Sequence, residues 1–390
     1  MFKRIFLIIM DSFGCGEAPD AEQFGDKGSN TLKTCYESKK FKAPNLKKLG
    51  LLNIDNIGID DKEKSVLGSF AKLEEKSAGK DTTTGHWEIA GLVSNKTMPT
   101  FPNGFPKEIL SKITKIWGRG YLVNKPYSGT EVLLDYGEEH IETGKLIVYT
   151  SADSVFQIAA HEDYVPLEDL YKYCKEAREL LTGKYAVGRV IARPFVGEYP
   201  NYERTPNRHD YSLLPPKKTM LNILKENGKD VIAVGKISDI FAGSGIGESH
   251  TIVSNADGME KTINLQKKDF EGLCFVNLVD FDSKYGHRND IDGYAQAVTD
   301  FDIQLGKFLK GMRDDDLLII SADHGCDPKT KSTDHSREFV PMLAVGKGVR
   351  ENNNLGTIKG FDAIAKTILE NFDIKSKEIS GTSFLKDILK

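Results

Sequence analysis

The chain has 390 residues, a length that allows two domains and a large buried core. With 39% apolar residues, 28% charged residues and a net charge of −4, the composition argues against a broad nucleic-acid or anionic-membrane surface. Five cysteines without a CxxC spacing fit a reducing compartment better than a disulfide framework. We therefore expect a cytoplasmic protein with neither a nucleic-acid nor a membrane partner, and the sequence leaves its oligomeric state unknown.

The N-terminal segment, residues 1–11, has the outline of a signal peptide. Its apolar run, residues 5–10, is too short for one, and Asp11 ends the run without a small-residue cleavage site. No other segment approaches the ~20 apolar residues of a membrane span. We expect the chain to open on a buried strand.

Short apolar runs recur along the chain between helical patterns. They are continuous rather than alternating, as in strands that are covered on both faces. The runs are residues 5–10, 231–234, 273–279 and 317–320. Apolar residues recur every three or four positions from Tyr294 to Phe308 and within residues 361–372, and this periodicity predicts two helices. The alternation predicts an α/β fold with a doubly wound, mainly parallel sheet.

The middle of the chain is punctuated by prolines at both ends. One cluster begins at Pro99 and the other begins at Pro206. Between them, residues 146–150 and 185–192 are strand candidates, and residues 167–181 form a helix candidate with one apolar face. We predict an inserted α/β cap domain at 99–211, with 1–98 and 212–390 forming one discontinuous core domain.

Acidic and imidazole side chains follow the predicted core strands at their ends. They are Asp11, Asp282, His287, Asp323, His324 and His335. Taken alone, Asp11 could cap a helix, and the loop of Asp282 and His287 could be solvated with one buried histidine. Asp323-His324 is harder to explain in this way, because a charged pair directly behind a buried strand needs a partner. Since open α/β folds build sites at this edge of the sheet, the loops together favour a metal centre.

The ligand set contains carboxylates and imidazoles, and Cys326 is not needed in it. This set suits Mn, Zn or Fe better than Mg. Six protein ligands are too many for one tetrahedral ion. They fit two ions about 3.5–4 Å apart, the spacing that clamps the attacking and leaving oxygens in phosphoryl transfer. We therefore expect two divalent cations in the core domain.

A stretch bounded by glycines, residues 79–88, supplies three consecutive hydroxyls at Thr82, Thr83 and Thr84. A threonine at a helix start is more often a cap than a nucleophile. A metal-bound hydroxyl, however, loses its proton more easily and becomes a competent attacking group. The stretch therefore offers a nucleophile to the metal centre.

The order of these motifs resembles the alkaline phosphatase superfamily of metal-dependent phosphoryl-transfer enzymes. The motifs are, in chain order, the acid after the first strand, the hydroxyl in a glycine-flanked turn, Asp-x4-His, Asp-His and the final His. Within this superfamily, the chain is similar to the phosphopentomutase family. The matching stretches span nearly the whole chain and are residues 10–12, 16–21, 79–88, 149–154, 188–195, 204–210, 235–239, 279–287, 322–328 and 333–335. The resemblance implies an alkaline phosphatase-like core with an inserted cap.

The resemblance also implies a role for each matching residue. Thr82 would carry the phosphoryl group and bridge toward the metals. One metal would be held by Asp11, Asp323 and His324, and the other by Asp282, His287 and His335. The sugar phosphate would face Ser151, Asp153, Arg189, Ile191 and Arg204 of the cap and Lys236 of the core. Arginine and lysine suit a dianionic phosphate, although without the resemblance these residues could equally form surface ion pairs.

The implied activity is that of an isomerase of nucleoside and pentose phosphate metabolism. It would interconvert ribose 5-phosphate, or 2-deoxyribose 5-phosphate, and the 1-phosphate through phospho-Thr82 and a pentose 1,5-bisphosphate. The implied cofactors are two divalent cations, with Mn²⁺ favoured, and glucose 1,6-bisphosphate or a similar sugar bisphosphate as activator. The cap would exclude water, because water would turn a mutase into a phosphatase.

Three other functions stay open on the same residues. A metal-dependent phosphatase or phosphodiesterase would lose the phosphoryl group of Thr82 to water as fast as a pentose phosphate turns over. A cofactor-independent phosphoglycerate mutase shares the metal pattern but should have a serine nucleophile and a different insertion. A sugar-phosphate sensor without turnover would not need Thr82.

Overall fold

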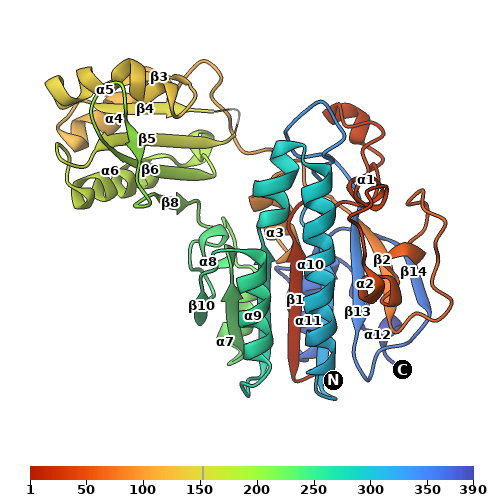
Figure 1. Ribbon diagram of the computed structural model, residues 1–390. Coiled ribbons are helices and arrows are strands. Elements are labelled where there is room, and N and C mark those ends of the chain that lie inside the picture. Colours follow the sequence, from red (N-terminus) through yellow and green to blue (C-terminus); the bar gives the residue numbers. More distant parts are fainter. Residues whose placement is uncertain (152) are drawn as a thin grey trace. The chain divides into compact units, whose positions relative to one another are not determined.

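The structure is a computed structural model that describes residues 1–151 and 153–390. Contacts divide the chain into two compact units (Figure 1). The core unit consists of Met1–Lys96 and Pro215–Lys390, and the inserted unit consists of Thr97–Leu214. The sequence had placed the two boundaries at 98/99 and 211/212.

The core unit is built on an eight-stranded sheet. From one edge to the other its strands are β10 (Glu248–His250), β9 (Asp230–Val234), β11 (Gly272–Leu278), β1 (Arg4–Met10), β12 (Asp316–Ser321), β13 (Val340–Val345), β2 (Ser69–Glu74) and β14 (Asn353–Lys359). The strands from β10 to β12 are parallel, β13 is antiparallel to both of its neighbours, and β14 is parallel to β2. This arrangement confirms the predicted, mainly parallel α/β sheet.

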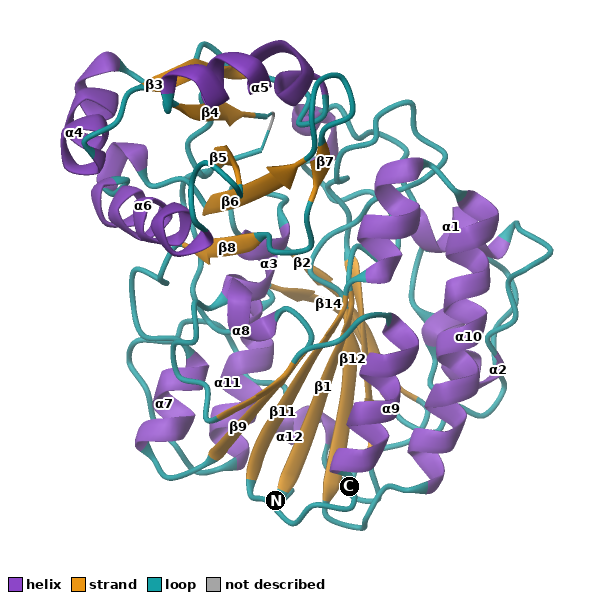
Figure 2. Cartoon of the chain, turned by 60° about the vertical axis from the view of Figure 1, so that its left-hand side comes forward, coloured by secondary structure: helices purple, strands orange, loops and turns teal. Residues whose placement is uncertain are grey.

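Helices cover the sheet of the core unit, as Figure 2 shows. They are α1 (Thr31–Tyr36), α2 (Pro44–Lys48), α3 (Thr82–Ile89), α7 (Met220–Glu226), α8 (Ile237–Ile240), α9 (Asn255–Leu265), α10 (Ile291–Lys310), α11 (Asp362–Asn371) and α12 (Leu385–Ile388). One group, α1, α2 and α9, packs against α10, whereas α3 and α7 pack against α11. All residues of β1, β11 and β12 are therefore buried, which explains their continuous apolar runs. The two predicted helices correspond to α10 and α11.

The inserted unit has a six-stranded sheet of its own. Its strands are β3 (Tyr121–Pro126), β4 (Leu146–Thr150), β5 (Val155–His161), β6 (Arg189–Val196), β7 (Glu203–Arg204) and β8 (His209–Ser212), and its helices are α4 (Lys107–Trp117), α5 (Glu131–Thr143) and α6 (Leu167–Leu180). The predicted strand at 185–192 begins four residues late, at Arg189, because Gly183–Tyr185 form a 3-10 turn behind α6.

The two faces of this second sheet differ in what covers them. Residues of α4 and α6 form one apolar cluster with Val148, Phe156 and Val190, whereas residues of α5 form a second cluster with Tyr149 and Phe195. Consecutive residues of a strand point to opposite faces, so this register fixes which side chains share the α5 face. Among the residues that the structure describes, no helix is both long and apolar enough to cross a membrane.

Candidate active site

Three adjacent parallel strands bring the predicted metal ligands of the core unit to one edge of the sheet. Strand β1 lies between β11 and β12, with Met10 opposite Leu278 and Ile9 opposite Ser321. The three strands therefore end at nearly the same level. Asp11 follows β1 directly, Asp323 and His324 follow β12, and Asp282 lies in the π-helical turn η4 (Phe281–Tyr285) behind β11.

Asp11, Asp323 and His324 form the first ligand group. Their ligand atoms lie within 4.8 Å of one another. The Nε2 atom of His324 is 3.6 Å from Oδ1 of Asp11 and 3.2 Å from Oδ2 of Asp323. All three side chains are at most 1% exposed, so whatever balances their charge must lie inside the protein.

Each buried carboxylate of this first group has one oxygen bound by the protein and one oxygen without a donor. Asp11 Oδ2 accepts from Asn277 Nδ2 at 2.7 Å, and Asp323 Oδ1 accepts from the Ser12 backbone N–H at 3.0 Å. Asp11 Oδ1 and Asp323 Oδ2 have no hydrogen bond, although His324 lies beside both and His86 Nδ1 is 3.1 Å from Asp323 Oδ2. Buried carboxylate oxygens without a donor are costly and therefore rare. A cation would satisfy both oxygens, so the residues fit a metal.

Asp282, His287 and His335 converge in the same way. His287 Nε2 is 3.1 Å from Asp282 Oδ2, His335 Nε2 is 3.5 Å from Asp282 Oδ1, and the two Nε2 atoms are 3.2 Å apart. His287 donates from Nδ1 to the Thr333 carbonyl at 2.7 Å, so its Nε2 lone pair faces this cluster. Asp282 Oδ1 has no hydrogen bond either. His324 also groups with Asp282 and His335, which joins this cluster to the first.

The pKa shifts of the three carboxylates indicate that the cluster holds too little positive charge to balance them. Burial raises the pKa of Asp11 above its usual value, and the carboxylates of Asp323 and Asp282 raise it further. Burial also acts to raise the pKa values of Asp282 and Asp323, but neighbouring imidazoles outweigh it and hold both below their usual values. Several carboxylates therefore compete for a few imidazoles, and divalent cations would relieve that competition.

Thr82 is the first residue of α3 and lies beside the predicted metal ligands. Its Oγ1 atom is 3.2 Å from His324 Nε2. The neighbouring hydroxyl of Thr84 donates to Asp81 Oδ2 at 2.6 Å, and Asp81 also accepts from the Thr84 N–H as the helix cap. Of these two hydroxyls, Thr84 is thus committed to the cap, whereas Thr82 faces the centre.

A chain of polar contacts that the sequence analysis missed ties Thr82 to the first ligand group. Asn277 donates to Asp11 and lies 3.3 Å from Nε2 of His86, and His86 Nδ1 donates to the Thr82 carbonyl at 2.8 Å. A Cβ on Gly85 would lie 2.1 Å from the Asp323 carbonyl oxygen, so glycine lets α3 approach this loop. A lone asparagine inside the apolar run of β11 was the available signal.

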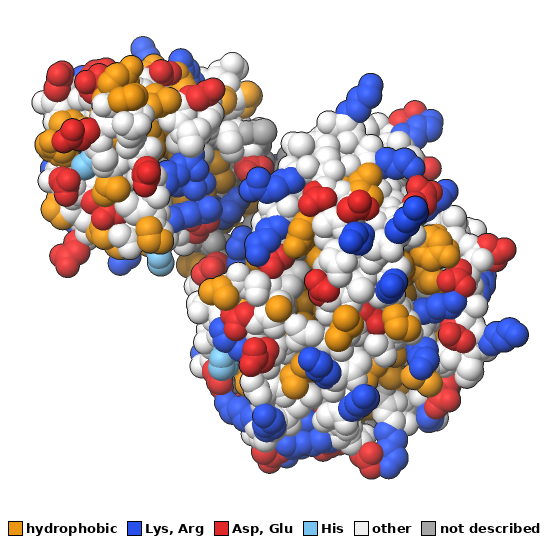
Figure 3. All heavy atoms as spheres, viewed as in Figure 1, with side chains coloured by type: hydrophobic (Ala, Val, Ile, Leu, Met, Phe, Trp, Pro, Cys, Tyr) orange, Lys and Arg blue, Asp and Glu red, His pale blue; other side chains and the backbone are white. Residues whose placement is uncertain are grey.

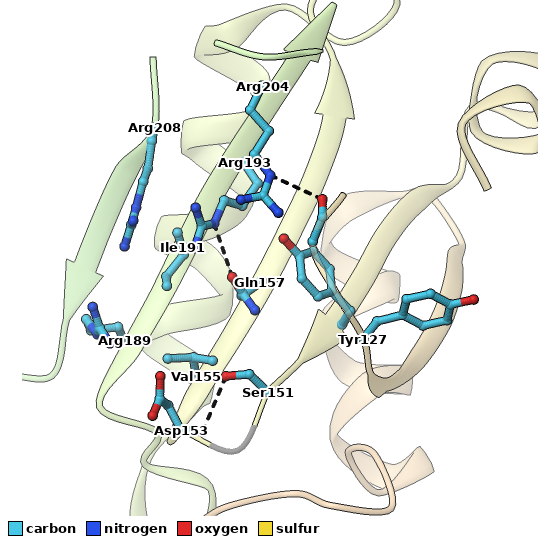
Figure 4. A pocket seen from close by; sticks show the side chains of 12 residues that line it. Tyr127, Ser151, Asp153, Val155, Gln157, Arg189, Ile191, Arg193, Arg204 and Arg208 are labelled. Carbon is cyan, nitrogen blue, oxygen red and sulfur yellow. Dashed lines mark hydrogen bonds between the residues drawn. The ribbon is translucent and has the colours of Figure 1, made fainter. Parts of the chain in front are cut away.

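The inserted unit contains a cavity of about 250 Å³ that we call the arginine pocket (Figure 4). It is lined by Tyr127, Gly129, Tyr149, Ser151, Asp153, Val155, Gln157, Arg189, Ile191, Arg193, Arg204 and Arg208. Figure 4 shows Arg193 and Arg204 toward one end and Arg189 with Asp153 toward the other. In Figure 3, basic side chains gather on part of the visible face of this unit, while charges of both signs are mixed over the core unit.

The arginines of the pocket are held in place by neutral or shared partners. Arg193 Nε donates to Gln157 Oε1 at 3.1 Å, and Arg204 Nε donates to the Gly129 carbonyl at 3.1 Å. Arg208 and Arg189 share Asp210, at 2.6 and 3.4 Å. The pocket therefore keeps an excess of positive charge, which suits a dianionic phosphate.

Tyr149 contributes an unsatisfied hydroxyl to this pocket. The residue is 1% exposed, and its Oη atom has no hydrogen-bond partner. Burial raises the pKa of Tyr149, while Arg193, Arg204 and Arg208 act to lower it, so this hydroxyl lies near three guanidinium groups. A ligand oxygen in the pocket would accept its hydrogen bond.

The structure places the predicted substrate-binding residues as follows. Ser151, Asp153, Arg189, Ile191 and Arg204 all line the arginine pocket. Lys236 is an exposed residue of the core unit, directly before α8. The sequence analysis missed Arg193, Arg208, Gln157 and Tyr149. Period-two alternation from Arg189 through Ile191 to Arg193 was the signal for the first of them.

Comparison with known proteins identifies the family. Residues 3–376 match the model of the Metalloenzyme superfamily. The chain is 59% identical over 391 residues to the phosphopentomutase of Lachnoclostridium phytofermentans, with both chains covered completely. It is 54% identical to the phosphopentomutase of Acetivibrio thermocellus, over 99% of this chain and 100% of the relative. The chain belongs to the phosphopentomutase family. This confirms the predicted family, its enzyme class as an isomerase that moves a phosphoryl group within its substrate, and its use of divalent metal.

Solved structures that are similar to this phosphopentomutase family member share its fold. The PH0037 protein from Pyrococcus horikoshii aligns with a TM-score of 0.51 at 17% identity, over 97% of this chain and 99% of that one. A phosphoglycerate mutase from Leishmania mexicana aligns with a TM-score of 0.50 at 12% identity, over 98% and 97% of the two chains. At these identities the likeness shows the fold alone.

Proposed function

We propose that this isomerase interconverts ribose 5-phosphate, or 2-deoxyribose 5-phosphate, and the corresponding 1-phosphate, with Thr82 as the phosphoryl carrier and a pentose 1,5-bisphosphate as the intermediate. Membership of the phosphopentomutase family supports the substrate class. One structural observation carries the mechanism. Buried oxygens of Asp11, Asp323 and Asp282 accept no hydrogen bond, and they lie in a cluster that also faces the hydroxyl of Thr82.

The six ligands divide between two cations in this proposal. Asp11, Asp323 and His324 would hold one, and Asp282, His287 and His335 would hold the other. We propose Mn²⁺ for both, because a mixed carboxylate and imidazole set suits it better than Mg²⁺. When bound, the cations offset charge on the phosphoryl oxygens and lower the pKa of the Thr82 hydroxyl.

The protein itself positions Thr82 for transfer. Asp81 fixes the start of α3, and the contact of His86 with the Thr82 carbonyl holds the first turn against the ligands. A phosphoryl group on Thr82 would also lie at the positive end of this helix. His324, 3.2 Å from Oγ1, keeps the hydroxyl directed into the cluster.

The reaction requires two transfers. In the first, the free sugar hydroxyl bonds to phosphorus as the bond to Thr82 Oγ1 breaks, and the hydroxyl proton passes overall to the threonine oxygen. In the second, Thr82 attacks the other phosphate of the bisphosphate and the steps reverse. A sugar bisphosphate such as glucose 1,6-bisphosphate would phosphorylate Thr82 at the start. That transfer leaves a sugar monophosphate as its other product.

The arginine pocket supplies binding groups for the phosphate that is not being transferred. Ser151, Asp153, Arg189, Ile191 and Arg204 line this pocket and are the proposed contacts within the inserted unit. Lys236 of the core unit is a proposed substrate contact that rests on the family resemblance. Guanidinium groups can bind a phosphate bidentately, which fixes its orientation as well as its charge.

A substrate panel tests this function. The Mn²⁺-loaded protein, activated with glucose 1,6-bisphosphate, is incubated with ribose 5-phosphate, 2-deoxyribose 5-phosphate or 3-phosphoglycerate and followed by ³¹P NMR. We expect the pentose 1-phosphates to appear, with phosphate released far more slowly. Phosphate release as fast as isomerisation would favour a phosphatase instead. Turnover of 3-phosphoglycerate without turnover of pentose phosphates would favour a phosphoglycerate mutase.

A further inference from the structure

Cys326 lies beside the proposed ligands of the second cation. Its Sγ atom, a carboxylate oxygen of Asp282 and a ring nitrogen of His287 all lie within 4.8 Å of one another. The residue is 1% exposed and forms no disulfide. The sequence analysis left this thiol without a role.

The surrounding backbone makes room for the thiol. A Cβ on Gly286, the residue before His287, would lie 3.0 Å from Sγ and 3.1 Å from Cβ of Cys326. Any larger residue at 286 would therefore push the thiol away from the cluster. The thiol's hydrogen bond is a long one, 3.6 Å to the Asp334 carbonyl directly before His335.

The carboxylate beside the thiol has an oxygen without a hydrogen-bond partner. Asp282 is 6% exposed, and its Oδ1 atom has no hydrogen bond. His287 and His335 direct their Nε2 atoms toward Asp282 at 3.1 and 3.5 Å. Asp282, His287 and the thiol thus lie together, and His335 lies against the same carboxylate. Carboxylate, imidazole and thiolate are all groups that bind Zn²⁺.

We propose that Cys326 is a fourth ligand for thiophilic divalent ions at this position and makes it prefer Cd²⁺ or Zn²⁺ to Mn²⁺. The inference rests on the metal centre proposed above. Thiolate is a soft ligand that favours Zn²⁺ and Cd²⁺, whereas Mn²⁺ favours oxygen and nitrogen. Binding of a thiophilic ion replaces the S–H bond by a metal–sulfur bond and releases the proton to solvent. Without a thiophilic ion, the thiol keeps its long hydrogen bond to the Asp334 carbonyl.

Cadmium titration of the metal-free full-length protein tests this proposal, with bound metal counted by equilibrium dialysis. A cadmium–thiolate bond produces a charge-transfer band in the near ultraviolet, which oxygen and nitrogen ligands do not. The variants are Cys326→Ser and Cys326→Ala, and the matched control is Cys274→Ser, since Cys274 is buried in β11 opposite Phe6. Circular dichroism confirms the fold of each variant.

We expect the band in the wild type and in Cys274→Ser, and no band in either Cys326 variant. Removing the thiol should lower the ratio of cadmium to manganese affinity by about 10- to 100-fold. Stoichiometric cadmium binding by the wild type without the band would overturn the proposal, whatever the folding of the variants. A band that persists in both Cys326 variants would do so as well. Failure of the wild type to bind either metal would instead refute the metal centre.

Discussion

The metal centre of the core unit and the arginine pocket of the inserted unit are opposites in charge. The first is a set of buried carboxylates and imidazoles in which oxygens of Asp11, Asp282 and Asp323 lack a donor. The second is a set of guanidinium groups around the unpartnered hydroxyl of Tyr149. The metal centre is therefore suited to a cation, and the arginine pocket is suited to an anion. In both units, buried polar atoms without a hydrogen-bond partner mark the candidate binding site.

The two sites also differ in how the chain builds them. The metal centre uses residues that follow strand ends, at a level set by the pairing of β1 with β11 and β12. The arginine pocket uses alternate residues on one face of β4, β5 and β6. Substitutions that weaken one site should therefore leave the other site intact.

Loss of the nucleophile has the largest expected effect. Thr82→Val removes the hydroxyl that faces His324 while nearly keeping its volume, and mutase activity should fall about 10⁴-fold or more. Thr83→Val is the matched control in the same turn and should fall far less. Initial rates by ³¹P NMR measure both. Retention of a tenth of the activity by Thr82→Val would remove Thr82 from the mechanism.

Metal binding should depend on the carboxylate oxygen that has no donor. Mn²⁺ at about 100 times its Kd should stabilise the wild type by about 2.7 kcal/mol. Asp323→Asn can still accept from the Ser12 N–H but replaces an oxygen by an amide, so manganese affinity should fall by more than the roughly 10- to 100-fold that loss of a supporting residue costs. Thermal melts with Mn²⁺ and with a chelator give the comparison. Equal stabilisation of both proteins would mean that Asp323 is no ligand.

Tyr149→Phe should separate binding from stability in the inserted unit. The hydroxyl is buried without a partner, so its removal should leave the free energy of unfolding unchanged or higher. A hydrogen bond to a charged phosphate contributes about 1.5–3 kcal/mol, so kcat/KM should fall about 10- to 150-fold. Tyr171→Phe is the control, since that hydroxyl already donates to the Asn207 carbonyl. An unchanged kcat/KM for Tyr149→Phe would place the phosphate elsewhere.

The smallest effect concerns acid stability of the inserted unit. His140 donates from Nδ1 to the Lys145 carbonyl, and its Nε2 accepts from the His161 N–H. Burial lowers the pKa of His140 below its ordinary value of 6.5. Because the folded state then binds fewer protons than the unfolded state, this contribution is complete above pH 6.5 and is lost as the pH falls below it.

Denaturant unfolding at pH 5.5 and 7.5 measures this effect through Trp117, with Trp87 of the core unit replaced by Phe. His140→Gln should flatten the difference between the two pH values. A wild-type inserted unit that is more stable at the lower pH would contradict the argument. The metal centre of the core unit should be unaffected by this substitution.

The convergence of the acidic and imidazole loops could be predicted from the sequence because their signal is local. Each apolar run ends abruptly in an acid, and the ends of parallel strands meet at one edge, so Asp11, Asp323 and His324 could be grouped without coordinates. The strands of mixed pairing, β2, β13 and β14, were missed. Strand β14 alternates between partly buried and exposed residues at the sheet edge, and its sequence lacks an apolar run.

The arginine pocket was only partly predictable, because its residues depend on register. Arg189 and Arg204 came from the family resemblance, but Arg193 joins them only once β6 is known to start at Arg189. Gln157 and Tyr149 reach the same face through the pairing of β4 with β5. A hydroxyl without a partner is a property of packing and has no signature in the sequence.

Mass mapping of the phosphorylated residue tests the central claim most directly. The protein is incubated with Mn²⁺ and glucose 1,6-bisphosphate, digested, and analysed for phosphopeptides, with Thr82→Val in parallel. We predict one phosphate on Thr82 that disappears on addition of ribose 5-phosphate and never forms in the variant. Phosphate on Thr83 or Thr84, or on no residue at all, would contradict the account.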